Sequence, residues 1–337
     1  MRSYKLLAIF LVISLVLLGC SEKNKEELQS EETASTSSPE ENQTEESEAL
    51  TLENDGINEE EFKEALGTFP DEMKEKIITS SVPISEILYE LDITPVGIPT
   101  SPYELPEKFN DIPEIGTSMT PDIEVITSLD ADFFIGSASV KESLDEHLKN
   151  IALDTSYLGT DNFDDIKMAI KVLGTYFDKK DNMNAMLEDI LLWENTLIEE
   201  GASLEKQKAL LLIGTSDSFM VMNNNTYLGS ILKRTNIENV AETEFKSEET
   251  YAAINMENII QANPDVIFVL AYGDAEDIKK EFLNEIDKNE AWKSLVAYEN
   301  DAIQFLDYDV YGVSSIKNME TALTGITEFL EVAETNE

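Results

Sequence analysis

The stretch INMENIIQANPDVIFVLAYG, residues 254–273, sets out the plan of the fold. It starts as an amphipathic helix, turns at Asn263-Pro264-Asp265 and continues as an apolar strand. The stretch PDIEVITSLDADFFIGSAS, residues 121–139, has the same order of features. In both stretches a glutamate opens the helical part, and the aspartate of the turn follows eight residues later. The repeat predicts two lobes of similar plan.

Further apolar runs predict the strands of these lobes, at 76–79, 133–135, 209–214, 266–270 and 302–306. Helical patterns lie between the runs. Continuous apolar strands that alternate with helices are typical of parallel sheets covered on both faces. We therefore expect an α/β fold with two Rossmann-like lobes, at 75–162 and 206–337.

Residues 163–205 predict a long helical connection between the lobes, because their apolar residues recur every three or four positions. Two alternatives are open, namely one long kinked helix, or two helices with a turn near Asp181-Asn182. Either arrangement would restrict hinge motion more than two extended strands would.

The N-terminus predicts a secretion signal over residues 1–19. Arg2 and Lys5 precede an apolar run, residues 6–18, that is shorter than the about 20 residues of a membrane-spanning helix. The run ends in Leu17-Leu18-Gly19-Cys20, which resembles the lipobox of bacterial lipoproteins. This resemblance implies that Cys20 carries palmitate or a related lipid and holds the protein on the outer face of the cell membrane. A short uncleaved anchor is the alternative.

Charge and composition narrow the functional classes. The chain has 69 acidic and 24 basic residues, a net charge of −45, which excludes the positive surface that nucleic-acid binding requires. Residues 20–74 are acidic and low in complexity, so we expect a solvated tether there. Cys20 is the only cysteine, which excludes disulfides within the chain. No nucleophile-base-acid set, phosphate-binding glycine loop or zinc motif is visible, so no enzyme activity is expected.

Several long stretches resemble the binding proteins of ABC importers for cobalamin, siderophores and haem. Among these stretches are VGIPTSPYELPEKFNDIPEIGTSMTPDIEVITSLDADFFIGSASVKESL, residues 96–144, and TYLGSILKRTNIENV, residues 226–240. They are similar to the haem-receptor lipoproteins of Gram-positive iron-regulated surface systems, and the similarity covers nearly all of the chain after about residue 75. The resemblance implies a monomer that captures haem and delivers it to an ABC permease. A ferric siderophore, a corrinoid or directly bound iron are the alternative ligands.

The resemblance also implies the axial ligands of the haem iron. The family has a methionine ligand in a G-x-x-M-x-P loop, and Met119 holds that place in Gly116–Pro121. A thioether is a soft ligand suited to haem iron; packing in a small apolar cluster is the alternative role of Met119. The second family ligand is a histidine, and Tyr272 stands there instead. Three alternatives are open: Tyr272 replaces the histidine as the second iron ligand, the iron is five-coordinate, or the ligand is not haem. Tyr311 is a weaker candidate for the place of the histidine.

Other candidates follow from the size and charge of a porphyrin. Tyr103 is a candidate for stacking on the ring, whereas Lys233, Arg234 and the amides around Tyr227 are candidates for binding the propionates. A solvated helix face is the alternative for the two cations. The only histidine, His147, lies in a pattern typical of an amphipathic surface helix, so it is not expected to bind iron.

Two glutamates at matching positions of the repeat, Glu124 and Glu257, open helices where the helix dipole favours a carboxylate. In the importer class, the equivalent glutamates meet arginines of the permease. The resemblance therefore implies that Glu124 and Glu257 guide docking to the permease.

Overall fold

A computed structural model of the protein describes residues 49–215 and 218–334. The predicted signal peptide, the lipid site Cys20 and the tether up to residue 48 lie outside the described residues. Among the described residues, no helix combines the length and the apolar character that a membrane span requires.

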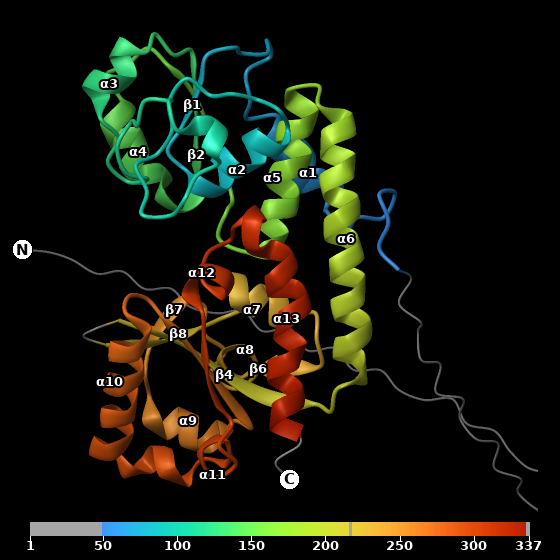
Figure 1. The fold of residues 1–337 in the computed structure, drawn as a ribbon, viewed down its shortest axis with the longest axis vertical. Coiled ribbons are helices and arrows are strands. Elements are labelled where there is room, and N and C mark those ends of the chain that lie inside the picture. Colours follow the sequence, from blue (N-terminus) through green and yellow to red (C-terminus); the bar gives the residue numbers. More distant parts are fainter. Residues whose placement is uncertain (1–48, 216–217, 335–337) are drawn as a thin grey trace, which may run out of the picture. The chain divides into compact units, whose positions relative to one another are not determined.

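The first sheet, in the part that we call the N-terminal lobe, has three parallel strands in the order β1-β2-β3. The strands are β1 (Ile77–Thr79), β2 (Phe133–Ser137) and β3 (Asp154–Leu158). The helices α2 (Val82–Glu90), α3 (Ile123–Ser128) and α4 (Lys141–Leu148) surround them (Figure 1). All residues of β1 and β2 are buried, as their apolar sequences predict.

The second sheet, in the C-terminal lobe, has six strands in the order β7-β5-β4-β8-β9, and β6 also pairs with β4. The strands β4 (Gln207–Gly214), β6 (Ile237–Asn239), β8 (Val266–Ala271) and β9 (Ile303–Leu306) are parallel. At one side of the sheet, β5 (Phe219–Met222) runs antiparallel to β4, and β7 (Tyr251–Ala253) runs antiparallel to β5. The helices of this lobe are α7 (Tyr227–Leu232), α8 (Val240–Thr243), α9 (Met256–Ala262), α10 (Ala275–Lys288), α11 (Val296–Glu299), α12 (Tyr308–Tyr311) and α13 (Ile316–Glu334).

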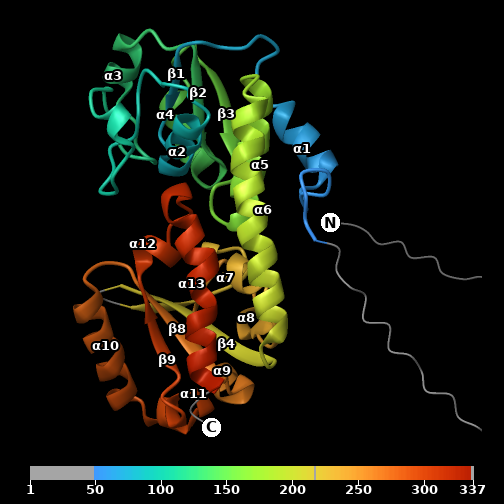
Figure 2. The same ribbon diagram turned by 45° about the vertical axis from the view of Figure 1, so that its right-hand side comes forward.

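Two helices connect the sheets, α5 (Phe163–Tyr176) and α6 (Lys180–Ser203), and they lie side by side in Figures 1 and 2. The chain turns between them at Asp178, whose φ of 52° is left-handed. The two-helix alternative is therefore confirmed, although the turn precedes Asp181. The 24 residues of α6 make it the long helix that joins the lobes.

A buried set of charged residues holds α5 and α6 together. Lys167 of α5 lies 2.7 Å from Glu194 of α6, and their side chains are only 2% and 4% exposed. Glu194 also lies 2.6 Å from Arg234, and Lys171 lies 2.7 Å from Asp55. We call these five residues the junction ion cluster. Because each buried carboxylate has a cation beside it, the cost of removing these charges from water is partly offset.

Residues 50–66, predicted as part of the tether, instead pack against α5 and α6, so this part of the prediction is wrong. The segment includes α1 (Glu59–Leu66), which lies beside α5 in Figure 2. The backbone of Leu50 exchanges two hydrogen bonds with the side chain of Asn195. Asp55 pairs with Lys171, and Phe62 packs on the main core. The acidic composition concealed this order, because two of its carboxylates, Asp55 and Glu59, pair with one lysine of α5, Lys171.

Candidate ligand-binding cleft

A cavity of about 630 Å³ lies between the two sheets and is lined from both lobes. Its volume is within the range of about 300–1,000 Å³ that is usual for small-molecule sites. Ser118 and Ser137 line it from the N-terminal lobe, Asn162 lines it at the start of α5, and Tyr272 and Tyr308 line it from the C-terminal lobe. These residues follow the carboxyl ends of strands or precede helices, which is where ligands bind in α/β folds.

The loop with Met119 borders the cavity, because its neighbour Ser118 is a lining residue. The side chain of Met119 is 53% exposed, which argues against packing in an apolar cluster. Hydrogen bonds fix its backbone, since Ser143 donates to the carbonyl oxygen of Met119 at 3.0 Å and Ser80 donates to that of Ser118 at 3.3 Å. Gly116, with a φ of +93°, provides the turn. The fold thus presents an unpacked thioether on an anchored loop.

Tyr272 lies on the opposite lobe, directly after β8. Its backbone N–H donates to the carbonyl oxygen of Gly214 at the end of β4, at 2.8 Å. Its side chain is 55% exposed and lines the cavity. The ring meets Tyr308 edge-on, with the ring centroids 5.1 Å apart. The phenol of Tyr272 is therefore held by the sheet and remains open to the cavity.

Four tyrosines line the cavity, namely Tyr103, Tyr251, Tyr272 and Tyr308, and we call them the cleft tyrosines. Burial raises the pKa of Tyr103, Tyr251 and Tyr308, and the nearby phenols raise the pKa of Tyr308 further. These three side chains are thus neutral at physiological pH. They can offer aromatic faces and O–H donors to a ligand.

Sequence reasoning missed two of the cleft tyrosines, Tyr251 and Tyr308. Tyr308 comes two residues after the predicted strand at 302–306, at the carboxyl edge where sites form, and this signal could have found it. Tyr251 lies in β7, a short edge strand that was not predicted. Tyr103, which was predicted, does line the cavity.

Two predicted tyrosines do not reach the cavity. Tyr227 is 2% exposed, and its hydroxyl has no hydrogen-bond partner among the described residues. Tyr311 is 4% exposed and packs edge-on against Phe329, and burial raises its pKa to about 12. Both side chains belong to the main core, so Tyr311 is not placed as a ligand, whereas the prediction for Tyr227 concerns the backbone amides around it and is not decided by its buried side chain.

The predicted propionate donors are also placed elsewhere. Arg234 belongs to the junction ion cluster: it binds Glu194 and Asp164, and its guanidinium lies 4.3 Å from the ring centroid of Phe163. Lys233 is exposed but does not line the cavity. His147 is exposed on α4, where its Nδ1 lies 2.7 Å from the carbonyl oxygen of Ser143.

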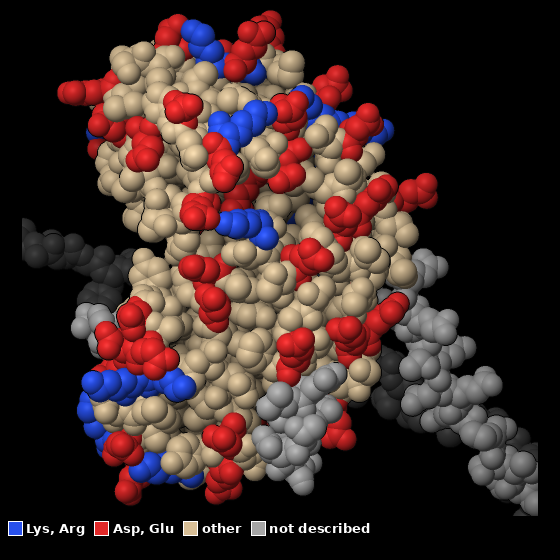
Figure 3. Space-filling view, viewed as in Figure 1, with Lys and Arg blue, Asp and Glu red and all other residues tan. Residues whose placement is uncertain are grey.

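The cavity carries negative charge. Asp161 and Asp165 line it, and burial raises the pKa of Asp165, which accepts a hydrogen bond from the N–H of Asp161. Acidic side chains are also scattered over the face shown in Figure 3 and outnumber the basic ones there. In the described part of the chain, no group of three or more His, Cys, Asp or Glu residues could hold a metal ion.

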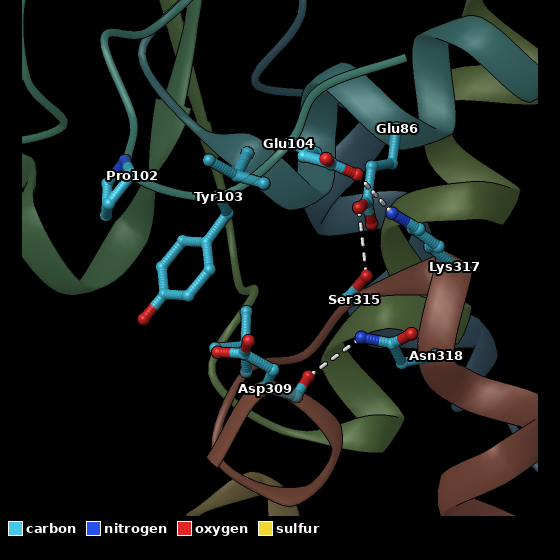
Figure 4. Close-up of a pocket in the computed structure, with 10 residues that line it drawn as sticks. Glu86, Pro102, Tyr103, Glu104, Asp309, Ser315, Lys317 and Asn318 are labelled. Atoms are coloured by element: carbon cyan, nitrogen blue, oxygen red, sulfur yellow. Dashed lines mark hydrogen bonds and ion pairs between the residues drawn. The ribbon is translucent and has the colours of Figure 1, made fainter. Parts of the chain in front are cut away.

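A smaller pocket of about 290 Å³ shares Tyr103 with the cavity (Figure 4). Here Glu86 of α2 accepts hydrogen bonds from the hydroxyl of Ser315 and the N–H of Ile316, at 2.9 and 2.7 Å. Burial raises the pKa of Glu86. A carboxylate of the N-terminal lobe thereby caps α13 at the edge of the cleft.

The two predicted docking glutamates have matching surroundings. Glu124 is exposed in the first turn of α3, whose N-cap Asp122 accepts a hydrogen bond from the Glu124 N–H at 2.9 Å. Glu257 is exposed in the first turn of α9, whose N-cap Asn255 accepts a hydrogen bond from the Glu257 N–H at 3.0 Å. The repeat seen in the sequence therefore places one exposed glutamate on each lobe.

Comparisons with known proteins agree with this architecture. The family described as periplasmic binding protein matches residues 77–310. The high-affinity heme uptake system protein IsdE of Staphylococcus aureus is 29% identical over 251 residues, which cover 74% of this chain and 85% of that protein. These matches confirm the predicted resemblance and a binding rather than an enzymatic family.

Solved structures give the same result for the fold. An ABC transporter substrate-binding protein from Listeria monocytogenes EGD-e matches with a TM-score of 0.70 and 29% identity, over 76% of this chain and 98% of that chain. The structure of S. aureus IsdE complexed with heme matches with a TM-score of 0.69 and 26% identity, over 76% of this chain and 99% of that chain. The predicted fold class, two α/β lobes with a helical connection, is confirmed.

Proposed function

The chain belongs to the periplasmic binding protein family, and from this premise we propose that it is the substrate-binding component of an ABC importer that captures haem. The observation that carries the proposal is the pair of exposed side chains on opposite lobes, Met119 on its anchored loop and Tyr272 after β8. Relatives that match over most of the chain are named for heme uptake or were solved with heme.

Met119 and Tyr272 would hold the haem iron from its two faces. A thioether and a phenolate are both known haem ligands, and the phenolate suits ferric iron. The neutral cleft tyrosines Tyr103, Tyr251 and Tyr308 would pack against the porphyrin and keep water from it. Because the two ligands come from different lobes, bound haem would join the lobes.

Delivery requires an anchor and a docking surface. We assign the anchor to lipid on Cys20, at the outer face of the cell membrane, and the docking surface to Glu124 and Glu257. Charge reversal at both glutamates is expected to stop haem uptake by cells while haem binding in solution stays normal, because both side chains are exposed away from the cavity lining. Loss of solution binding as well would instead assign the two residues a structural role.

The test of the proposed function is an absorbance titration of the chain without residues 1–20 with ferric haem, on the wild type and on Tyr272→Phe. A saturable Soret shift at one equivalent, altered in the variant, is expected. A shift that is identical in Tyr272→Phe would leave Met119 as the main ligand. No saturable shift in the wild type would refute haem binding and favour a ferric siderophore or a corrinoid.

A further inference from the structure

The cavity that would take haem has carboxylates but no cation in its wall. Its described lining residues include Asp161 and Asp165, and none of them is Lys, Arg or His. Ferric haem carries two propionates, and a carboxylate that leaves water without a cation or several hydrogen bonds is strongly disfavoured. Two aspartates nearby add repulsion.

The cations nearest to the start of α5 are engaged elsewhere. Arg234 binds Glu194 and Asp164, and Lys167, only 2% exposed, binds Glu194 and the carbonyl oxygen of Asp55. If either cation turned to the cavity, the buried Glu194 would lose one of its two ion pairs. Each is therefore held in place by its own partners.

The adjoining pocket offers little more to an anion. Its lysine, Lys317, lies 3.0 Å from Glu104 (Figure 4). The other charged residues of its lining, Glu86 and Asp309, are acidic. Carboxylates thus outnumber cations in this pocket too.

Several backbone positions at the helix starts beside the cavity, where amides often bind carboxylates, offer no free N–H. At the start of α5, the N–H of Phe163 donates to the hydroxyl of Ser230 at 3.0 Å, and that of Asp165 donates to the side chain of Asn162 at 2.9 Å. In the first turn of α2, Pro83 has no N–H to offer. An anionic group in the cavity would therefore meet two carboxylates and no cation among the described lining residues.

We propose that the cleft selects its ligand by charge: it binds the porphyrin with both propionates outside the cavity, and it excludes ferric chelates with a net negative charge. This inference rests on the proposed function and specifies the orientation of the haem. The porphyrin ring, which is apolar and aromatic, meets the cleft tyrosines, whereas the propionates stay in water.

The test compares ferric haem with its dimethyl ester, which lacks both propionate charges, in absorbance titrations of the chain without residues 1–20. Equal affinities are expected. If the ester binds more than about tenfold weaker, which is the loss expected when a charge-assisted hydrogen bond is removed, the inference is overturned while the proposed function stands. If neither porphyrin binds, the proposed function fails and the inference fails with it.

Two further measurements sharpen the result. Ferric citrate, an anionic chelate, is expected not to displace haem from the wild type, and displacement would contradict the charge selection. Asp161→Asn is expected to leave the ratio of the two porphyrin affinities at one, with Asp189→Asn on the exposed side of α6 as the matched control. A selective gain for free haem in Asp161→Asn would show that a propionate lies inside the cavity.

Discussion

The junction ion cluster and the cleft are neighbouring regions that differ in whether their carboxylates have cations beside them. In the cluster, Glu194 is buried between two cations, Lys167 and Arg234. In the cleft, Asp161 and Asp165 line the cavity, and none of the described lining residues is a cation. The basic residues next to α5 therefore stabilise the connection between the lobes through Glu194 and are engaged there.

The largest effect is expected from Glu194→Leu, which leaves Lys167 and Arg234 without their shared carboxylate. Because Lys167 is only 2% exposed, its unpaired charge should lower the free energy of unfolding by about 3–5 kcal/mol. Urea unfolding monitored by circular dichroism measures the loss. The control Glu146→Leu removes an exposed ion pair with Lys149 and should change the free energy of unfolding little, because water screens exposed pairs. Similar losses in both variants would contradict the contrast between the two regions.

A smaller effect, on binding alone, is expected from Met119→Ala. The side chain is 53% exposed and its loop is fixed through backbone groups, so stability should change little. Haem affinity should fall by about tenfold or more, which corresponds to about 1.4 kcal/mol, and the Soret band should move. Met73→Ala, which truncates another exposed methionine (57% exposed), is the matched control. An unchanged affinity and spectrum for Met119→Ala would remove this residue from the site.

The smallest effect, on the free energy of unfolding and its pH dependence, is expected from Glu86→Gln. The buried carboxylate of Glu86 accepts hydrogen bonds but has no cation at hydrogen-bond distance among the described residues. Burial raises the pKa of Glu86 in the folded protein. Its favourable contribution is therefore complete below the pKa of the unfolded chain and is lost as pH rises through the folded pKa.

Unfolding free energies of the wild type and Glu86→Gln between acidic and neutral pH measure this effect. The wild type should lose stability relative to the variant as pH rises. A relative gain over the same range would mean that the pKa of Glu86 is lowered instead.

The parts of the fold that the sequence predicts well are those with strong apolar periodicity. The runs at 133–135 and 266–270 are buried strands, and the pattern of 163–205 is helical. The strand β3 was missed because its sequence, DTSYL, is mostly polar. The strands β5, β6 and β7 have three or four residues each, which is too short for a clear period.

Site residues could be predicted where their position in a loop next to a strand or helix brings them to the cavity. They could not be predicted where their role depends on ion-pair partners from distant segments of the chain. Tyr103 and Tyr272, which the sequence predicts as ligand-binding residues, both line the cavity, since they lie in loops near its edge. Arg234 is used by Glu194, 40 residues away, and by Asp164, 70 residues away, and local sequence carries no signal of either pairing. The junction ion cluster thus removed a candidate that its charge alone had favoured.

The attachment of residues 50–66 to α5 and α6 has a mechanical consequence. Tension on the chain ahead of Leu50 is first borne by its two hydrogen bonds to Asn195 of α6, and then by the ion pair between Asp55 and Lys171 of α5. The load therefore enters the molecule at the helices that both lobes share. Neither sheet lies on this path, because Asn195 and Lys171 both belong to the connecting helices.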